Sequence, residues 1–375
     1  MDEKGVAERT VLQLMKEHRK RDVPFGRVLS SMCTRPHPLA IKAHMQYIET
    51  NLGDPYLFPG TKEVENNVVG MLGKLLGAPC ASGYITTGGT ESNIQALRVA
   101  RNLRRTPNPN IIIPESAHFS FDKAADVLGL ELKKASLDEH YRVCPASVED
   151  LIDESTVALV GIAGTTEFGQ IDPIDELAEL ALSSNVYLHV DAAFGGLVIP
   201  FLDKKHPFDF GVEGVSSIMV DPHKMGAGTI PSSGLLFRHE SHMEKLATST
   251  PYLVSKKQHS LTGTRTGASI AATYAIFKHF GYEGYRRIVK HCMNLTSTVE
   301  KWAEKFGIET FIKPVTNIVV LRIPSVDTVV PMLEERNWYV STTPKPKGLR
   351  LVMMPHMTEE TLNIFLADLG DVIEK

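Results

Sequence analysis

Short apolar runs and amphipathic stretches alternate through the middle of the chain. The apolar, β-branched runs cover residues 111–113, 157–162, 186–190, 218–220 and 235–237. Helical periodicity falls between several of them, at residues 91–105, 121–128 and 174–183. Strands without polar alternation, separated by helices, are typical of a mostly parallel sheet that is buried on both faces. The pattern therefore predicts an α/β domain whose chemistry lies at the carboxyl ends of its strands.

Both ends of the chain depart from this alternation. Residues 1–55 are predicted to form a largely helical N-terminal arm, with an apolar face that includes Val6, Val11 and Leu14. That face packs either on the arm's own domain or on a second copy of the chain, and both interpretations stay open. Residues 56–285 form the predicted large domain. A long helix to residue 305, strands at 318–321 and 349–354, and a last helix predict a small C-terminal α+β domain over residues 286–375.

Composition excludes several classes of protein. The 375 residues carry a formal net charge of −4, whereas electrostatic nucleic-acid binding usually needs a basic excess. No apolar run approaches the roughly 20 residues that span a membrane, and the charged N-terminus does not resemble an export signal. The four cysteines are scattered, and the histidines show no metal-ligand spacing. We therefore expect a cytoplasmic enzyme that binds no metal.

Two motifs follow predicted strands with small or aromatic residues. The segment TTGGTESN at residues 86–93 precedes a helix, and its Gly89 and Thr90 would let an anion approach free backbone N–H groups. This suits a phosphate, although an ordinary helix cap would look the same. His118 follows the strand at 111–113, where its ring could stack on a flat cofactor. Taken alone, a structural histidine is the simpler interpretation.

Charged and hydroxyl-bearing residues stand at the next strand ends. Asp191 closes the strand at 186–190, where a desolvated carboxylate needs a partner such as a protonated ring nitrogen. Lys224 follows the strand at 218–220, and a lysine in a closed site can lose its proton and attack a carbonyl. Thr165 and Thr166 offer hydroxyl groups. A turn-capping aspartate and a surface lysine are the structural alternatives. Together these groups match what pyridoxal 5′-phosphate requires of a protein.

The order and wording of these motifs resemble a known family. The segments that carry the resemblance are SMC at 31–33, NLGDP at 51–55, AHFSF at 117–121, GIAGTTEFG at 161–169, HVDAAFGG at 189–196, DPHKMG at 221–226, GTR at 263–265 and MPH at 354–356. They are similar to fold-type I pyridoxal-phosphate enzymes, and within these to the group II amino-acid decarboxylases, above all the archaeal L-tyrosine/L-aspartate decarboxylases. The resemblance implies an aspartate aminotransferase-like fold, with a mostly parallel seven-stranded sheet in the large domain.

The same resemblance implies a role for each matching residue of the cofactor site. Lys224 binds the cofactor covalently, and Asp191 pairs with its pyridine nitrogen. His118 and Ala193 pack on opposite faces of the ring. The remaining cofactor contacts are Gly89, Thr90 and His223 near the phosphate and Thr166 near the ring hydroxyl. Gly263 and Thr264 are expected to come from the partner subunit, which implies a homodimer with the active site at its interface.

The substrate side of the site is also implied by the resemblance. Arg350 matches the arginine that holds the α-carboxylate, a task for which a bidentate guanidinium suits better than an ammonium. Tyr252 matches the tyrosine of a mobile loop that protonates the product carbanion. Tyr56 and Phe58, with Met32, form the expected pocket wall, and this apolar wall favours L-tyrosine. Arg35 and Lys256 could serve a second carboxylate, so L-aspartate stays open.

The expected reaction is therefore decarboxylation of L-tyrosine to tyramine, of L-aspartate to β-alanine, or of both. The alternatives within fold type I are a glutamate decarboxylase, an aminotransferase or an aldehyde lyase, because the fold alone does not decide the reaction. A cysteine desulfurase would need a reactive cysteine on a late loop, and Cys292 lies inside a helical stretch. A non-catalytic relative would usually lose the lysine, and Lys224 is present. A nicotinamide-dependent oxidoreductase would need a G-x-G-x-x-G motif after a strand, which the sequence lacks.

Overall fold

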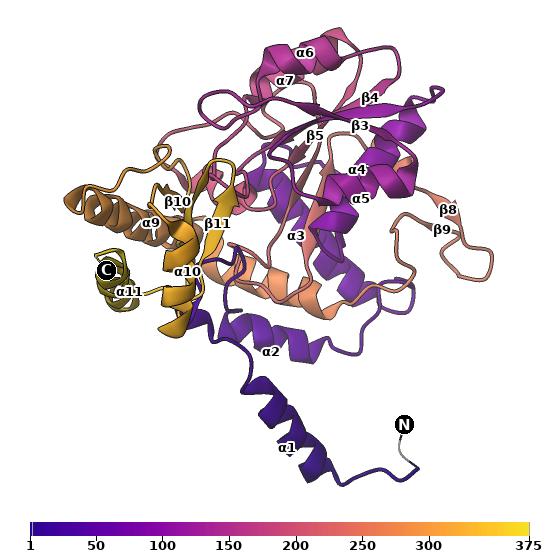
Figure 1. Ribbon diagram of the computed structural model, residues 1–375. Helices are drawn as coiled ribbons and strands as arrows, with labels where there is room; N and C mark the ends of the chain where they lie inside the picture. Colours follow the sequence, from indigo (N-terminus) through magenta and orange to yellow (C-terminus); the bar gives the residue numbers. More distant parts are fainter. Residues whose placement is uncertain (2, 375) are drawn as a thin grey trace.

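A seven-stranded sheet organises the chain in the computed structural model, which describes residues 1 and 3–374 (Figure 1). Its strand order is β1-β7-β6-β5-β4-β2-β3. The strands are β1 (Ser82–Thr86), β2 (Asn110–Pro114), β3 (Glu131–Ala135), β4 (Thr156–Ile162), β5 (Tyr187–Asp191), β6 (Val215–Val220) and β7 (Ser233–Phe237). Strand β7 is antiparallel to β1 and β6, and the other pairs are parallel. The predicted mostly parallel α/β fold is confirmed.

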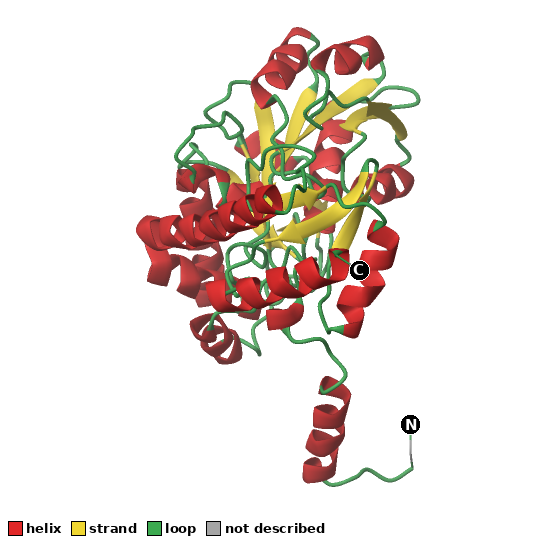
Figure 2. Ribbon diagram, turned by 60° about the vertical axis from the view of Figure 1, so that its left-hand side comes forward, coloured by secondary structure: helices red, strands yellow, loops and turns green. Residues whose placement is uncertain are grey.

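Helices cover both faces of this sheet, as Figure 2 shows. Every residue of β2, β4 and β5 is buried, because helices pack on both sides of these apolar runs. One apolar core lies between the sheet and α4 and α5, and the other lies under α3 and α7. The helices around the sheet are α3 (Pro59–Leu75), α4 (Gly89–Leu103), α5 (Ser120–Leu128), α6 (Pro145–Leu151), α7 (Ile174–Ser183) and α8 (Glu240–Glu244), with short 3₁₀ turns at Gly195–Leu197 and Ile199–Phe201.

Each of the five apolar runs of the central region coincides with a strand of the sheet, although the run at 186–190 begins one residue before β5. The apolar pattern does not reveal β1 and β3. Strand β3 is an edge strand, and polar Glu131, Lys133 and Lys134 make up most of it. Strand β1 contains Gly83, where a Cβ would lie 2.2 Å from the carbonyl oxygen of Leu235. The glycine therefore serves close packing of β1 on β7 and weakens the apolar signal of a strand.

The C-terminal part of the chain has its own sheet and core. The sheet is antiparallel, in the order β10 (Ile318–Leu321), β12 (Lys347–Val352) and β11 (Ser341–Pro344). Helices α10 (Val326–Glu335) and α11 (Glu359–Ile373) contribute to a separate apolar core, which Leu29 from the N-terminal segment also joins. Helix α9 (Ala268–Lys305) runs past the predicted boundary at residue 285, with non-helical backbone at Gly281. The domain boundaries therefore stay a prediction.

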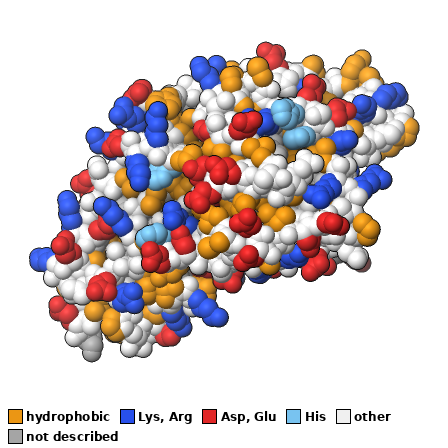
Figure 3. Space-filling model, turned by 90° about the horizontal axis from the view of Figure 1, so that it is seen from above, with side chains coloured by type: hydrophobic (Ala, Val, Ile, Leu, Met, Phe, Trp, Pro, Cys, Tyr) orange, Lys and Arg blue, Asp and Glu red, His pale blue; other side chains and the backbone are white. Residues whose placement is uncertain are grey.

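The N-terminal segment consists of two helices and a 3₁₀ turn. Helix α1 (Glu8–Arg19) projects away from the body, and none of its residues is buried (Figure 1). The turn (Phe25–Arg27) and α2 (Pro38–Gln46) follow, and α2 packs along α9. Acidic and basic side chains intermingle over the face that Figure 3 shows, without a field of one sign. None of the described helices is long and apolar enough to cross a membrane.

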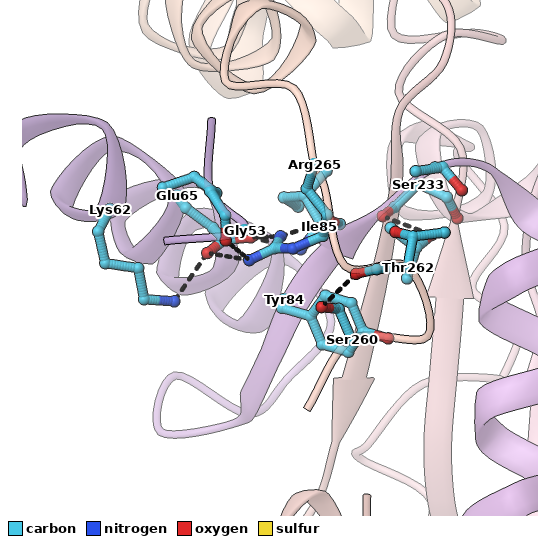
Figure 4. A network of polar contacts seen from close by, with 12 residues as sticks. Gly53, Lys62, Glu65, Tyr84, Ile85, Ser233, Ser260, Thr262 and Arg265 are labelled. Carbon is cyan, nitrogen blue, oxygen red and sulfur yellow. Dashed lines mark hydrogen bonds and ion pairs between the residues drawn. The ribbon is translucent and has the colours of Figure 1, made fainter. Parts of the chain in front are cut away.

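A buried ion pair ties the segment before α9 to the sheet (Figure 4). The Glu65 carboxylate on α3 pairs with the Arg265 guanidinium, and both side chains are almost fully buried. Lys62 Nζ also lies 2.7 Å from Glu65 Oε2. At strand β1, the Ile85 N–H donates to Glu65 and the Ile85 carbonyl accepts from Arg265. We call Lys62, Glu65 and Arg265 the Glu65 cluster.

Candidate active site

A cavity of about 200 Å³ opens at the carboxyl ends of the parallel strands. Strands β4, β5 and β6 end there, and the N-terminus of α4 points into the same place. This is the edge at which open α/β sheets usually bind ligands. The cavity is lined by Met32, Gly89, Thr90, Asn93, His118, Ile162, Gly164, Thr166, Asp191, Ala193, Phe194, Met219, Asp221, His223 and Lys224. Nine of the residues named from the sequence are therefore brought together.

Lys224 reaches the cavity from the turn that follows β6. Its Nζ lies 3.3 Å from Asp221 Oδ2, and its side chain is 20% exposed. The other oxygen of this carboxylate, Asp221 Oδ1, is buried and has no hydrogen-bond partner among the described residues. A Cβ at Gly89 would lie 3.0 Å from Asp221 Oδ2 and 2.7 Å from Met219 Cε, so only glycine fits there without a shift. The amine is thus paired, accessible and placed at the floor of the cavity.

Asp191 presents its carboxylate at the end of β5. Oδ1 accepts the backbone N–H of Ala193 at 3.0 Å, and Oδ2 accepts Asn93 Nδ2 at 2.9 Å. The residue is 6% exposed. The two hydrogen-bond donors hold the carboxylate in place beside the cavity, where it can face a cationic ring nitrogen.

His118 enters the cavity from the segment between β2 and α5. Burial lowers the pKa of its imidazole, although the nearby Asp191 opposes this shift. Nδ1 accepts the Ser120 backbone N–H at 3.2 Å, which fixes the ring's orientation. A neutral, oriented imidazole beside the cavity has the properties needed to stack on a flat aromatic ligand.

The N-terminus of α4 provides the anion-binding end of the cavity. Gly88 has φ +129°, and the helix begins at Gly89. Glu91 holds the preceding turn, because its Oε2 accepts the N–H and the hydroxyl of Thr87 at 2.8 and 2.6 Å. The unpaired N–H groups of a helix start, with His223 nearby, suit a phosphate. His223 Nδ1 donates to the Ser232 carbonyl at 2.5 Å, which leaves Nε2 free to face a ligand.

Arg350 stands behind the wall of the cavity on β12. Its Nε donates to the carbonyl of Thr166 at 2.6 Å, and Nη1 donates to Ser30 O and Ser341 Oγ. Nη2 is buried and has no partner among the described residues. Burial lowers the pKa of this guanidinium to about 10, with Glu167 opposing the shift. A guanidinium held on two nitrogens with the third free is suited to binding a carboxylate.

Five residues named from the sequence lie outside this cavity. Tyr252 is 85% exposed in the hairpin between β8 (Thr248–Ser249) and β9 (Lys257–Gln258). Gly263 and Thr264 are exposed on the segment before α9. Tyr56 is 64% exposed, and Phe58 is half-buried against the core. Their roles stay predictions, because nothing within one chain brings them to the cavity.

Two functional residues were part of quoted motifs but received no role from the sequence. Asn93 lies four residues after Gly89, so the helical repeat puts both on one face of α4, toward Asp191. Asp221 precedes Lys224 by three residues and turns back onto it. A polar residue one turn along a helix from a glycine-rich start was the available signal for Asn93.

The donor set fits pyridoxal 5′-phosphate. Asp221 Oδ1 and Arg350 Nη2 are buried polar atoms that lack partners within the described chain, and Gly89 keeps the cradle free of a Cβ. The cavity also combines an amine, a carboxylate with two donors and a helix N-terminus. An aldehyde, a pyridine nitrogen and a phosphate are the groups that these three features complement.

Comparisons with known proteins point in the same direction. A family model described as the pyridoxal-dependent decarboxylase conserved domain matches residues 36–323. A Methanothrix thermoacetophila protein named "Probable L-tyrosine/L-aspartate decarboxylase" is 57% identical over 99% of this chain and 97% of its own length. An Archaeoglobus fulgidus protein named "Probable L-aspartate decarboxylase" is 50% identical over 97% of this chain and all of its own.

Solved structures share the architecture over the whole chain. A Burkholderia pseudomallei sphingosine-1-phosphate lyase superimposes with a TM-score of 0.92 at 28% identity, covering 100% of this chain and 92% of that one. A Lactobacillus brevis glutamate decarboxylase gives a TM-score of 0.92 at 22% identity, covering 100% and 94%. The second likeness shows the fold alone, because its sequence identity is low.

Proposed function

The chain belongs to the pyridoxal-dependent decarboxylase family, and from this premise we propose that it decarboxylates L-tyrosine, L-aspartate or both. The observation that carries the proposal is the 57% identity, over nearly the full length of both chains, to a protein named for these two substrates. The cavity supports it, because it combines the accessible amine of Lys224 with the unpartnered guanidinium nitrogen of Arg350 behind its wall. Tyramine and β-alanine would be the products, which would supply methanofuran and coenzyme A synthesis respectively.

Each cavity residue would hold one part of the cofactor. Lys224 would bind the aldehyde carbon, Asp191 the ring nitrogen, and Gly89, Thr90 and His223 the phosphate. His118 and Ala193 would flank the ring, and Thr166 would lie near its hydroxyl group. When bound, pyridoxal 5′-phosphate supplies an electron sink for the bond that breaks at the substrate's α-carbon.

The protein's own residues orient the substrate and manage its protons. Arg350 Nη2 would bind the α-carboxylate, while the bonds from Nε and Nη1 hold the guanidinium still. Asp221 Oδ2 lies within reach of the Lys224 proton, so it keeps the amine in the cavity when the substrate amine arrives. Proton delivery to the α-carbon is assigned to Tyr252 of a second chain or to Lys224.

The lining of the cavity favours the larger, less charged substrate. Its apolar side chains include Met32, Ile162 and Phe194. A second carboxylate would need a second cation, and Arg35 and Lys256 are both exposed and do not line the cavity. We therefore propose L-tyrosine as the preferred substrate and L-aspartate as the slower one.

A side-by-side assay tests this order. The purified, cofactor-loaded enzyme is given L-tyrosine, L-aspartate or L-glutamate, and carbon dioxide and the amine product are measured without any keto acid present. We expect tyramine to form with a kcat/KM at least tenfold above that for β-alanine. A faster reaction with aspartate reverses the order of preference, and the absence of both products refutes the proposed function.

A homodimer is part of the proposal. Helix α1 buries no residue within one chain, and its apolar Val11, Leu14 and Met15 are all exposed. Removal of residues 1–20 would then weaken the dimer. Light scattering should give a mass twice the 41.4 kDa of one chain for the full-length protein. A fully active monomer would contradict this assignment.

The four free cysteines are consistent with a cytoplasmic location, which is also proposed.

A further inference from the structure

A chain of buried hydrogen bonds extends from Asp191 away from the cavity. Asn93 Nδ2 donates to Asp191 Oδ2, and Asn93 Oδ1 lies 2.9 Å from His189 Nε2. His189 Nδ1 lies 2.8 Å from Ser217 Oγ on the neighbouring strand. Asn93, His189 and Ser217 are each at most 1% exposed. His189 and Ser217 are shielded from the protein surface, so these neighbours are their hydrogen-bond partners within the described chain.

The Asp191 carboxylate determines which group donates and which accepts in each of these hydrogen bonds. An ionised carboxylate only accepts hydrogen bonds, so the Asn93 amide must turn its NH₂ toward Asp191 and its oxygen toward His189. His189 must then donate from Nε2, which leaves Nδ1 to accept the hydroxyl of Ser217. Burial lowers the pKa of His189 to about 4, which is consistent with the neutral ring that this arrangement needs.

Loss of the hydrogen bond between His189 and Asn93 shows what this row of hydrogen bonds does. If His189 could not donate to the amide oxygen, Asn93 would be free to flip, and its oxygen would then face the Asp191 carboxylate. The second proton of Asn93 Nδ2 goes to Ser120 Oγ at 2.9 Å, and the Ser120 N–H holds His118 at 3.2 Å. One amide therefore connects the supports of two residues that face the ring position.

We propose that Asn93 and His189 are positioning residues that keep the Asp191 carboxylate aimed at the cofactor's ring nitrogen. This inference rests on the proposed function and adds to it, because neither residue was assigned a role by the family resemblance. Asn93 acts directly on the carboxylate. His189 does not line the cavity and makes no hydrogen bond to Asp191 among the described residues, although the Asp191 charge acts on its ring. We assign its effect to the hydrogen bond with Asn93 Oδ1.

The first test replaces one atom of Asn93. In Asn93→Asp the donor becomes an acceptor, and a second negative charge faces Asp191. We expect the affinity for pyridoxal 5′-phosphate, measured by fluorescence titration of the apoprotein, to fall about 10- to 100-fold. The visible absorption band of the bound cofactor should also change its pH dependence, because the ring nitrogen loses a fully charged partner.

A matched control separates positioning from folding. Gln95 lies two residues along the same helix, is 0% exposed, and donates to Tyr84 Oη and the His259 carbonyl away from the cavity. Gln95→Glu makes the same chemical change at the same depth. We expect it to lower the thermal stability at least as much as Asn93→Asp does, yet to bind the cofactor within about threefold of wild type. Equal losses of affinity in both variants would overturn the proposal.

A double-mutant cycle tests the route through the amide. His189→Gln should weaken cofactor binding severalfold in the wild-type background and have no further effect in an Asn93→Ala background. Additive effects would show that His189 acts through packing alone, against the proposal. If wild type itself binds no pyridoxal 5′-phosphate, the proposed function fails. If wild type binds it and releases carbon dioxide while Asn93→Asp binds as tightly, only this inference fails.

Discussion

Two groups of buried charges in the protein differ in how many of their polar atoms have hydrogen-bond partners. In the Glu65 cluster, both carboxylate oxygens have partners, and the guanidinium of Arg265 donates to Glu65 and to backbone carbonyls, with only Nε left over (Figure 4). The second group, which we call the cavity cluster, comprises Asp191, Asp221, Lys224 and Arg350. It leaves Asp221 Oδ1 and Arg350 Nη2 without partners in the described chain.

The pKa shifts reflect the same contrast. Burial would raise the pKa of Glu65, but Arg265 and Lys62 outweigh it and hold the pKa below its usual value. Arg350 has only Glu167 against burial, and its pKa drops to about 10. An ion pair in which both carboxylate oxygens have partners holds segments of the fold together, whereas buried charges without partners persist where a ligand supplies them. The presence or absence of hydrogen-bond partners, more than burial, therefore distinguishes the Glu65 cluster from the cavity cluster.

The largest expected difference between the two clusters appears when one lysine is removed from each. Lys224→Ala should lower decarboxylation at least about 1000-fold and abolish the yellow colour of the bound cofactor, because no other amine lines the cavity among the described residues. Lys62→Ala removes a partly exposed partner of Glu65 and should change turnover less than about twofold. Steady-state assays on both variants check this. Full turnover and colour in Lys224→Ala would refute the assignment.

The next effect concerns stability. Glu65→Gln leaves the Arg265 guanidinium buried beside a neutral amide, so we expect the free energy of unfolding to fall by about 3–5 kcal/mol. Glu63→Gln on the exposed side of α3 should stay within about 0.5 kcal/mol of wild type. Urea unfolding at one protein concentration measures both values. A neutral result for Glu65→Gln would show that the Glu65 cluster does not hold the fold together.

Arg350→Lys should act on substrate binding. The lysine keeps the positive charge but loses the fixed geometry in which Nη2 is free, so KM should rise about 10- to 100-fold while the cofactor stays bound. Arg322→Lys, at an exposed arginine beside the same small sheet, serves as the control and should leave KM unchanged. An unchanged KM in Arg350→Lys would place the substrate carboxylate elsewhere.

The smallest effect depends on pH. The pKa of His189 is about 4 in the fold, against a usual 6.5. Between these values the unfolded chain binds a proton that the folded chain does not, so the unfolding free energy decreases as the pH falls from 6.5 toward 4. The decrease from this group is roughly 1.4 kcal/mol per pH unit. Urea unfolding at pH 7, 6 and 5 should show a steeper loss for wild type than for His189→Gln. Equal slopes would contradict the neutral, buried imidazole.

The sequence predicted the residues that stand in motifs at strand ends. Asp191, Lys224 and His118 follow short apolar runs, so the α/β pattern alone places them at one edge of the sheet. The pattern does not predict contacts between side chains that lie far apart in the sequence. Glu65 and Arg265 are 200 positions apart, and a buried carboxylate on α3 gives no local signal of its partner.

The same limit applies to the outer parts of the site. The roles of Tyr252, Gly263 and Thr264 come from the family resemblance, and all three are exposed in the single chain. None of the three lines the cavity of the single chain, and the pattern of one sequence defines neither loop movements nor contacts between two copies. The polar edge strand β3 was missed for a local reason, since half-exposed lysines hide the strand signal.

Reduction of the cofactor-loaded enzyme with borohydride, followed by peptide mass mapping, tests the central claim most directly. Reduction makes a carbonyl–amine linkage permanent, so the mass of the cofactor stays on the lysine that held it. The account predicts this added mass on the peptide that contains Lys224 and no added mass on the peptides that contain Lys62. A cofactor attached to any other lysine, or a bound cofactor attached to none, would contradict the division between the two clusters.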